Sequence, residues 1–160
     1  MRTVEIAKSD GRLRRLGIPT VADRVAQMVV KMHLEPDVEP NFHPDSYGYI
    51  RGRSALEAVG VVRKRCWRYN WVIDLDIKGF FDHVDHEILM RLVRRVVKDR
   101  RVLGLIRGWL KAGVLEEGKV RYATSGTPQG GVISPLLSNV YLTVLDNALE
   151  ERGYRFVRYA

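Results

Sequence analysis

Residues Trp71 to His86 read WVIDLDIKGFFDHVDH, and the fold prediction starts from this stretch. Over 71–77, bulky apolar side chains alternate with a set that includes Asp74 and Asp76, which is typical of a strand with one buried face. The two aspartates therefore share one face of the predicted strand. A helix is expected to follow from about residue 83 to 97, with Asp82 as its N-cap.

Asp76 would lie at the C-terminal end of this strand, shortly before Gly79. A carboxylate on a rigid strand end, beside a glycine, often holds a Mg²⁺ ion that binds phosphate oxygens. A solvated strand end is the simpler explanation of an isolated aspartate, and the residues alone leave both open. Asp74 either adds negative potential near such a metal or pairs with an arginine.

Two more aspartates and two histidines complete this stretch. Asp82 and Asp85 fall at the start of the expected helix, where capping and the positive helix terminus explain both. His83 and His86 are three residues apart and could share a zinc ion. The sequence shows no second ligand pair with metal spacing, so both histidines are interpreted as structural or surface residues.

Strands and helices alternate irregularly along the rest of the chain. Pro36 is expected to end the first helix, and Ser54 with Glu57 matches a capping box. Together these patterns predict an α+β fold with a mostly antiparallel sheet and packed helices. The expected elements are hairpins over 4–18 (turn at Asp10-Gly11) and 114–122, helices over 21–34, 54–67, 100–112 and 134–152, and a strand over 154–160.

The composition limits the class of protein. The 160 residues are 46% hydrophobic and 29% charged, so the chain is expected to fold. A net charge of +8 favours a polyanionic partner, with solubility as the other explanation; basic residues cluster near 12–15 and over 91–101. The single cysteine, Cys66, suits a reducing cytosol, and no apolar run has the length of a membrane span. A cytoplasmic protein without a membrane partner is therefore expected.

The second informative segment is SGTPQGG (125–131), a loop that leads into a helix at Ser134-Pro135. Its glycines permit close approach of the backbone to a ligand, and Gln129 offers both a donor and an acceptor. The helix N-terminus just beyond favours anions. A flexible turn is the alternative, although the segment is too polar and too constrained for a mere spacer.

Four sequence blocks together resemble one family. DIKGFFDHVDHEIL (76–89) and GTPQGGVISPLLSNVYL (126–142) resemble the two central blocks of group II intron-encoded reverse transcriptases, also called maturases. KSDGRLRRLGIPTVADRVAQ (8–27) and FHPDSYGYIRGRSALEAV (42–59) resemble the two preceding blocks. The resemblance covers essentially the whole chain. It implies an RNA-directed DNA polymerase that uses two Mg²⁺ ions, with an RNA template, intron RNA, a DNA primer or target, and deoxynucleoside triphosphates as partners.

The resemblance also implies roles for residues of the opening stretch. Asp76 is implied to be catalytic and to be the first metal aspartate, and the carbonyl of Ile77 can join it at the metal. Phe81 resembles the ring that excludes ribonucleotides by clashing with their 2′-hydroxyl. Phe80 can instead fill the core, and the pattern alone does not separate the two rings.

Other residues are implied to bind nucleotide or nucleic acid. Lys8 and Arg14 fall on the fingers hairpin, where the family contacts the triphosphate, and Gln129 resembles the residue beside the incoming nucleotide. Solvated hairpin charges are the alternative for Lys8 and Arg14. The family usually reads SYGFRPGRS where this chain has SYGYIRGRS (46–54), which puts a nucleic-acid contact from position 50 in doubt. Four arginines are assigned to nucleic-acid binding: Arg12, Arg15, Arg51 and Arg53.

The family pattern divides the chain into 1–53, mainly fingers; 54–83, palm with the first catalytic block; 84–133, helices, hairpin and nucleotide-pocket loop; and 134–160, palm helix and start of the catalytic hairpin. The family's next block, Tyr-Ala-Asp-Asp, brings two more aspartates, and this sequence stops before them. We therefore expect a reverse transcriptase fragment, truncated before the Asp-Asp hairpin and inactive alone. The alternatives are a non-catalytic RNA-binding module, or a reverse transcriptase of another bacterial retroelement or defence system.

Overall fold

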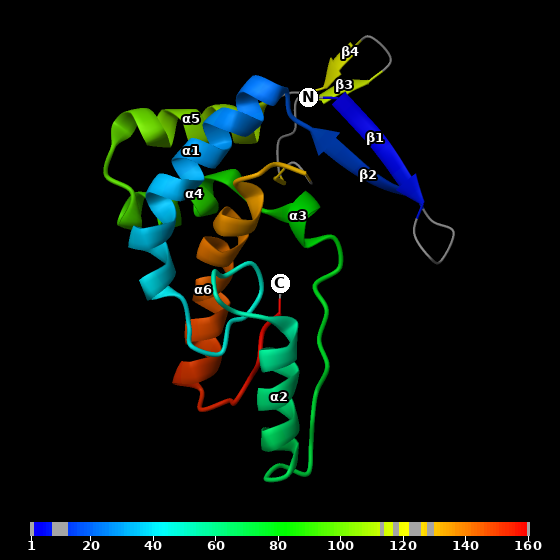
Figure 1. The fold of residues 1–160 in the computed structure, drawn as a ribbon, viewed down its shortest axis with the longest axis vertical. Coiled ribbons are helices and arrows are strands. Elements are labelled where there is room, and N and C mark those ends of the chain that lie inside the picture. The colour runs from blue at the N-terminus through cyan, green and yellow to red at the C-terminus, as the bar shows by residue number, and fades with distance from the viewer. Residues whose placement is uncertain are drawn as a thin grey trace.

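The computed structural model describes residues 2–7, 13–112, 114–116, 119–121, 126–127 and 130–159. Its regular structure is mainly helical (Figure 1). The helices are α1 (Val21–Val38), α2 (Ala55–Cys66), α3 (Phe80–His83), α4 (His86–Val96), α5 (Arg100–Lys111) and α6 (Ser134–Glu151), with a 3-10 turn, η1 (Glu39–Asn41), after α1. The strands are β1 (Arg2–Ala7), β2 (Leu13–Ile18), β3 (Val114–Glu116) and β4 (Lys119–Arg121).

The strands form one small sheet with the order β2-β1-β3-β4. β1 pairs antiparallel with β2, and β3 pairs antiparallel with β4. A single parallel pair, Arg2 with Leu115, joins the two hairpins. Both hairpins predicted from the sequence are present, although the Asp10-Gly11 turn lies outside the described residues. So few strands do not show the mostly antiparallel sheet that the sequence led us to expect.

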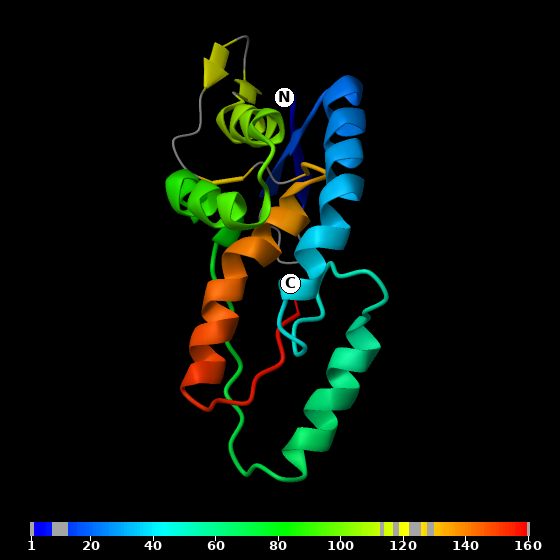
Figure 2. The same cartoon turned by 90° about the vertical axis from the view of Figure 1, so that its left-hand side faces the viewer.

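The apolar core lies between α1, α4, α5 and α6. Leu89 of α4 and Ile106 of α5 have no exposed surface, and Leu136 of α6 is 1% exposed. In α2 only Ala58 is buried. Figure 2 accordingly shows α2 set apart from the helices of the core. No helix in the described part of the chain is both long and apolar enough to cross a membrane.

The first helix is longer than predicted. Pro36 was expected to end it, but α1 continues through Pro36 to Val38. The reason is burial: Leu34 and Val38 are 5% and 2% exposed, so the last turn packs on the core on both sides of the proline. The free energy of this packing offsets the cost of Pro36, which has no N–H to donate to the carbonyl four residues earlier.

The helix expected over 83–97 is two helices in the structure. α3 ends at His83, Val84 adopts an extended conformation, and α4 begins at His86. Val84 is 2% exposed, so turning its side chain into the core interrupts the helical path. The prediction of Asp82 as the N-cap is therefore wrong. Asp85 is the N-cap, and its carboxylate accepts a hydrogen bond of 2.8 Å from the backbone N–H of Ile88.

Two predicted strands are absent from the described structure. Residues 71–77 have no strand assignment, and Trp71, Ile73 and Leu75 are more than 80% exposed. Residues 154–159 make one isolated bridge, between Arg158 and Ser46. A strand is stabilised by pairing with a neighbouring strand, and no other described strand lies beside either segment. Alternation alone therefore identified extended backbone but not a paired strand.

The N-cap of α4 gives a direct test. We expect Asp85→Ala to lower the free energy of unfolding by about 1 kcal/mol, because the N–H of Ile88 loses its acceptor. Asp85→Asn is the matched control, because its amide oxygen can accept the same bond. Urea denaturation of the three proteins measures the difference, and an asparagine variant as unstable as the alanine variant would contradict the capping role.

Candidate active site

The site is built around a tight turn that leads into α3. Gly79 adopts a left-handed conformation with φ of 64° and ψ of 31°, which favours glycine. The carbonyl of Gly79 accepts hydrogen bonds from the N–H of Asp82 at 3.0 Å and from Nδ1 of His83 at 2.8 Å. His83 therefore has a structural role, as the sequence suggested. The turn sets the direction in which the two phenylalanines of α3 point.

The two adjacent phenylalanines occupy different surroundings. Phe80 packs against the apolar core, and its ring lies edge-on to Tyr141 of α6 with 5.9 Å between centroids. Phe81 is half-buried, contacts the Phe80 ring at 5.4 Å and is not among the residues packed on the core. The structure thus separates two rings that the sequence pattern could not separate. Phe80 is the core residue.

The glycine-rich loop docks directly on α3. The N–H of Gly126 donates to the carbonyl of Val84 at 2.8 Å, and the N–H of Thr127 donates to that of Phe81 at 2.7 Å. The imidazole Nε2 of His86 also contacts the carbonyl of Gly126. A side chain at position 126 would place its Cβ 2.8 Å from the carbonyl oxygen of Phe81, and φ there is +89°. Only glycine therefore fits at this contact.

The same loop also contacts the β1–β2 hairpin and α1. A Cβ at Gly130 would lie 3.1 Å from the carbonyl oxygen of Gly17 in β2. The N–H of Ile133 donates to Oε1 of the buried Gln27 in α1 at 3.4 Å. The sequence suggested that these glycines permit approach to a ligand. At positions 126 and 130 the group approached is the chain's own backbone, so the glycines hold the loop in place.

Asp76 is exposed and lies on the extended segment that leads to α3. Its carboxylate and the carbonyl of Ile77 are oxygen donors of the kind that Mg²⁺ prefers, so the donor chemistry fits. Among the described residues, however, no three His, Cys, Asp or Glu side chains lie close enough together to hold a metal ion. Asp74 is exposed as well. The described part of the chain therefore shows no complete metal site, and the metal roles of Asp76 and Ile77 stay predictions.

The structure describes some of the other predicted site residues and leaves others outside the described ranges. Lys8, Arg12 and Gln129 lie outside the described residues. Arg14 and Arg15 belong to β2, opposite Ile6 and Glu5, and only their backbone positions are described. Arg51 and Arg53 are both exposed. The guanidinium of Arg53 donates to the carbonyl of Pro44 at 2.7 Å and lies 5.1 Å from the ring centre of Tyr47. Their roles in binding nucleotide or nucleic acid stay predictions.

A buried ion pair near the end of the chain was missed by the sequence reasoning. Arg158 donates from Nε and Nη2 to the two carboxylate oxygens of Asp146, at 2.9 and 2.8 Å, and from Nη1 to Oδ1 of Asn139 at 2.9 Å. The side chains of Arg158 and Asp146 are 10% and 0% exposed. Asn139 donates to the carbonyl of Gly48 at 2.9 Å. A signal was present: Asn139 and Asp146 are seven residues apart, on the buried face of α6.

A second ion pair secures the same region. Arg65 of α2 contacts both carboxylate oxygens of Asp45, at 2.8 and 2.7 Å, and donates to the carbonyl of Phe156 at 2.6 Å. The backbone of Arg158 pairs with the carbonyl of Asp45 and the N–H of Tyr47. These contacts tie together α2, the loop around residue 46, α6 and the extended segment 154–159. We refer to this set as the arginine clamp.

Comparison with known proteins identifies the family. The model of the family "Reverse transcriptase (RNA-dependent DNA polymerase)" matches residues 6–160. The chain belongs to the reverse transcriptase family. Members of this family generally use divalent metal ions, which agrees with the oxygen donors at Asp76 and Ile77.

Its relatives include proteins encoded by group II introns, as the sequence blocks predicted. The chain is 44% identical over 156 residues to the protein YkfC of Escherichia coli, covering 94% of this chain and 41% of that protein. It is 39% identical over 159 residues to the group II intron-encoded protein LtrA of Lactococcus lactis, covering 99% of this chain and 26% of LtrA. The chain thus spans less than half the length of these relatives.

A solved structure confirms the fold. The reverse transcriptase fold of a partial Cas6-RT-Cas1–Cas2 complex superimposes with a TM-score of 0.59 at 25% identity. The match covers 99% of this chain and 28% of that chain. The resemblance inferred from the sequence blocks is therefore confirmed at the level of family and fold.

The buried pair of the arginine clamp gives a second test. Asp146→Leu alone should lower the free energy of unfolding by about 3–5 kcal/mol, because Arg158 would stay buried without its counter-charge. The double variant Asp146→Leu with Arg158→Met should be more stable than either single variant, because no unpaired charge remains. Urea denaturation of all four members of the cycle measures the coupling. Single losses that simply add in the double variant would contradict a coupled buried pair.

Proposed function

We infer that residues 1–160 form the fingers and part of the palm of an RNA-directed DNA polymerase of a group II intron-type retroelement. One observation carries the proposal: the hydrogen bonds from Gly126 and Thr127 to α3 bring the glycine-rich loop and the Asp76–Phe81 block together. The two blocks are some 40 residues apart in sequence. Their contact forms one side of a pocket for an incoming nucleotide. The boundaries at residues 53, 83 and 133 belong to the same proposal.

Each predicted residue has a defined task in templated nucleotidyl transfer. Asp76 and the carbonyl of Ile77 hold metal, and Lys8 and Arg14 contact the triphosphate. Two Mg²⁺ ions, when bound, would activate the primer 3′-hydroxyl and neutralise charge on the phosphates. Gln129 packs beside the incoming nucleotide, and Phe81 excludes its 2′-hydroxyl. Arg12, Arg15, Arg51 and Arg53 contact the RNA template, intron RNA or the DNA primer.

A non-catalytic RNA-binding module is the second candidate for residues 1–160 taken alone. It is favoured by the net charge of +8, because lysine and arginine side chains neutralise phosphates. A reverse transcriptase of another bacterial element is also compatible with the likeness to a Cas-associated complex. The proteins encoded by group II introns share more of their sequence with this chain, and we therefore favour the intron-type element.

A chimaeric enzyme tests the polymerase proposal. Residues 1–160 would replace the matching segment of the LtrA protein, with unaltered LtrA as the reference. We expect the chimaera to extend a DNA primer on an RNA template with Mg²⁺ and deoxynucleotides, and the Asp76→Asn chimaera to lose synthesis with an unchanged or raised melting temperature. Residues 1–160 alone should show no extension above a no-enzyme control. A chimaera that melts cooperatively yet makes no DNA would contradict the proposal.

The same chimaera separates the two phenylalanines. Phe81→Val should raise incorporation of ribonucleotides relative to deoxynucleotides, because the smaller side chain leaves room for the 2′-hydroxyl. Phe80→Val should instead lower the free energy of unfolding by roughly 1 to 3 kcal/mol, because core packing is lost. Primer extension with each nucleotide type and thermal melting give the two readouts. If the effects are exchanged between the rings, the roles assigned to them are wrong.

A further inference from the structure

A basic and aromatic surface lies outside the proposed nucleotide site. Residues 63–71 read RKRCWRYNW, which places four cationic and three aromatic side chains in nine residues with no acidic residue among them. The segment comprises the end of α2 and the residues that follow it. We propose that it binds single-stranded RNA, and we call it the RKRCWRYNW surface.

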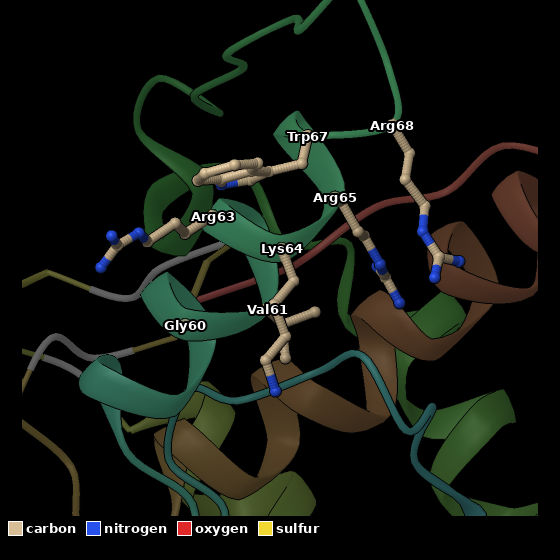
Figure 3. A pocket seen from close by; sticks show the side chains of 7 residues that line it. All are labelled: Gly60, Val61, Arg63, Lys64, Arg65, Trp67 and Arg68. Atoms are coloured by element: carbon tan, nitrogen blue, oxygen red, sulfur yellow. The ribbon is translucent and has the colours of Figure 1, made fainter.

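The side chains of this surface line a hollow at the end of α2. Figure 3 shows Arg63 and Trp67 extending to one side of the helix and Arg65 and Arg68 to the other. The hollow measures about 730 Å³ and is also lined by Gly60, Val61 and Lys64. Trp67 is 82% exposed and Trp71 is 89% exposed. These two rings place large exposed apolar surface beside the cations of the segment.

The cations of the surface are available to a ligand. Within the described part of the chain, the side chains of Arg63, Lys64 and Arg68 make no ion pair or hydrogen bond. Arg65 differs, because it is engaged in the arginine clamp and anchors this end of α2. The negative C-terminal end of the α2 dipole favours cations in the last turn, which is one reason for Arg63 and Lys64 to be there. It does not explain Arg68 beyond the helix, or the exposed indole between the cations.

The surface is separate from the proposed nucleotide site. In Figure 1 the end of α2 lies at the bottom of the molecule's long axis, whereas α3 and the β1–β2 hairpin lie in its upper half. A ligand that contacts this surface therefore need not occupy the pocket beside α3. A long nucleic acid could contact both.

The chemistry identifies the ligand as an unpaired polynucleotide. Arginine and lysine neutralise phosphates, and an exposed indole stacks on a base face that is free only where the strand is unpaired. The commitment to RNA rests on the proposed function, since an RNA-directed polymerase works on an RNA strand. Single-stranded DNA and duplex RNA are the competing ligands in the test.

Position 60 allows a test that removes nothing from the surface. A Cβ added at Gly60 would lie in open space, and Gly60 is one of the residues that line the hollow. Gly60→Glu should weaken binding of a labelled single-stranded RNA about tenfold at low salt, because it adds negative charge. Gly60→Gln is the matched neutral control and should bind as the unaltered chain does. Fluorescence anisotropy, without nucleotides or Mg²⁺, measures both.

Two further variants test the ring and the cations. Trp67→Ala should weaken binding about tenfold, and Trp67→Phe should restore most of it, because phenylalanine can still stack. Changing Arg63, Lys64 and Arg68 together to Gln should reduce the slope of log K against log salt by about 2, since each contact on a single strand contributes about 0.7. The control triple changes the exposed residues Arg24, Lys111 and Arg152 to Gln, and each triple lowers the net charge from +8 to +5.

These measurements test the RNA-binding proposal separately from the polymerase proposal. Equal losses in the two triples would show that net charge governs binding and would overturn it. Tighter binding of duplex RNA, equal binding of single-stranded DNA, or no effect of Gly60→Glu would also overturn it. The readout needs no synthesis, so an inactive chimaera would refute the polymerase proposal alone. Thermal melts of each variant confirm that the compared chains are folded.

Discussion

The buried ion pair between Arg158 and Asp146 is the contact on which the half of the molecule that contains α2 depends. The apolar core belongs to α1, α4, α5 and α6, while α2 buries only Ala58. Hydrophobic burial therefore contributes little to holding α2 and the segment 154–159 in place. Charge-assisted hydrogen bonds of the arginine clamp hold α2 and this segment instead. Buried hydrogen bonds of this kind are directional. The location of 154–159 is thus specified by a few polar side chains together with the backbone hydrogen bonds of Arg158.

The candidate site is held both by apolar packing and by hydrogen bonds. Phe80 on the core, and the backbone bonds from Gly126 and Thr127 to α3, fix the position of Phe81. The contacts of Gly130 and Ile133 then place the loop between β2 and α1. Preorganisation by packed elements is what a nucleotide pocket requires, because an ordered pocket loses less entropy on binding. This side of the site is therefore shaped before any ligand arrives.

Sequence reasoning succeeded where local patterns determine structure and failed where distant contacts do. The capping box of α2 and both hairpins could be predicted, because their signals lie within a few residues. The break at Val84, the helix through Pro36 and the His86 contact with Gly126 all arise from packing across the fold. The family followed from four blocks, but the role of Arg158 required knowing that Asn139 and Asp146 face inward. The alternation of apolar and polar residues over 71–77 predicted a strand, but this pattern does not show whether a neighbouring strand is present to pair with it.

The exposed position of Asp76 has a consequence for metal affinity. Its segment, 71–77, is exposed and makes no strand pair in the described structure, so no neighbouring strand would hold its backbone in one conformation around an ion. Fixing a residue's backbone costs roughly 1–2 kcal/mol, and several residues would be fixed together. One carboxylate and one carbonyl cannot offset that cost, because Mg²⁺ parts with its water reluctantly. Tight binding therefore requires further ligands that pair with this segment and share the cost of ordering it.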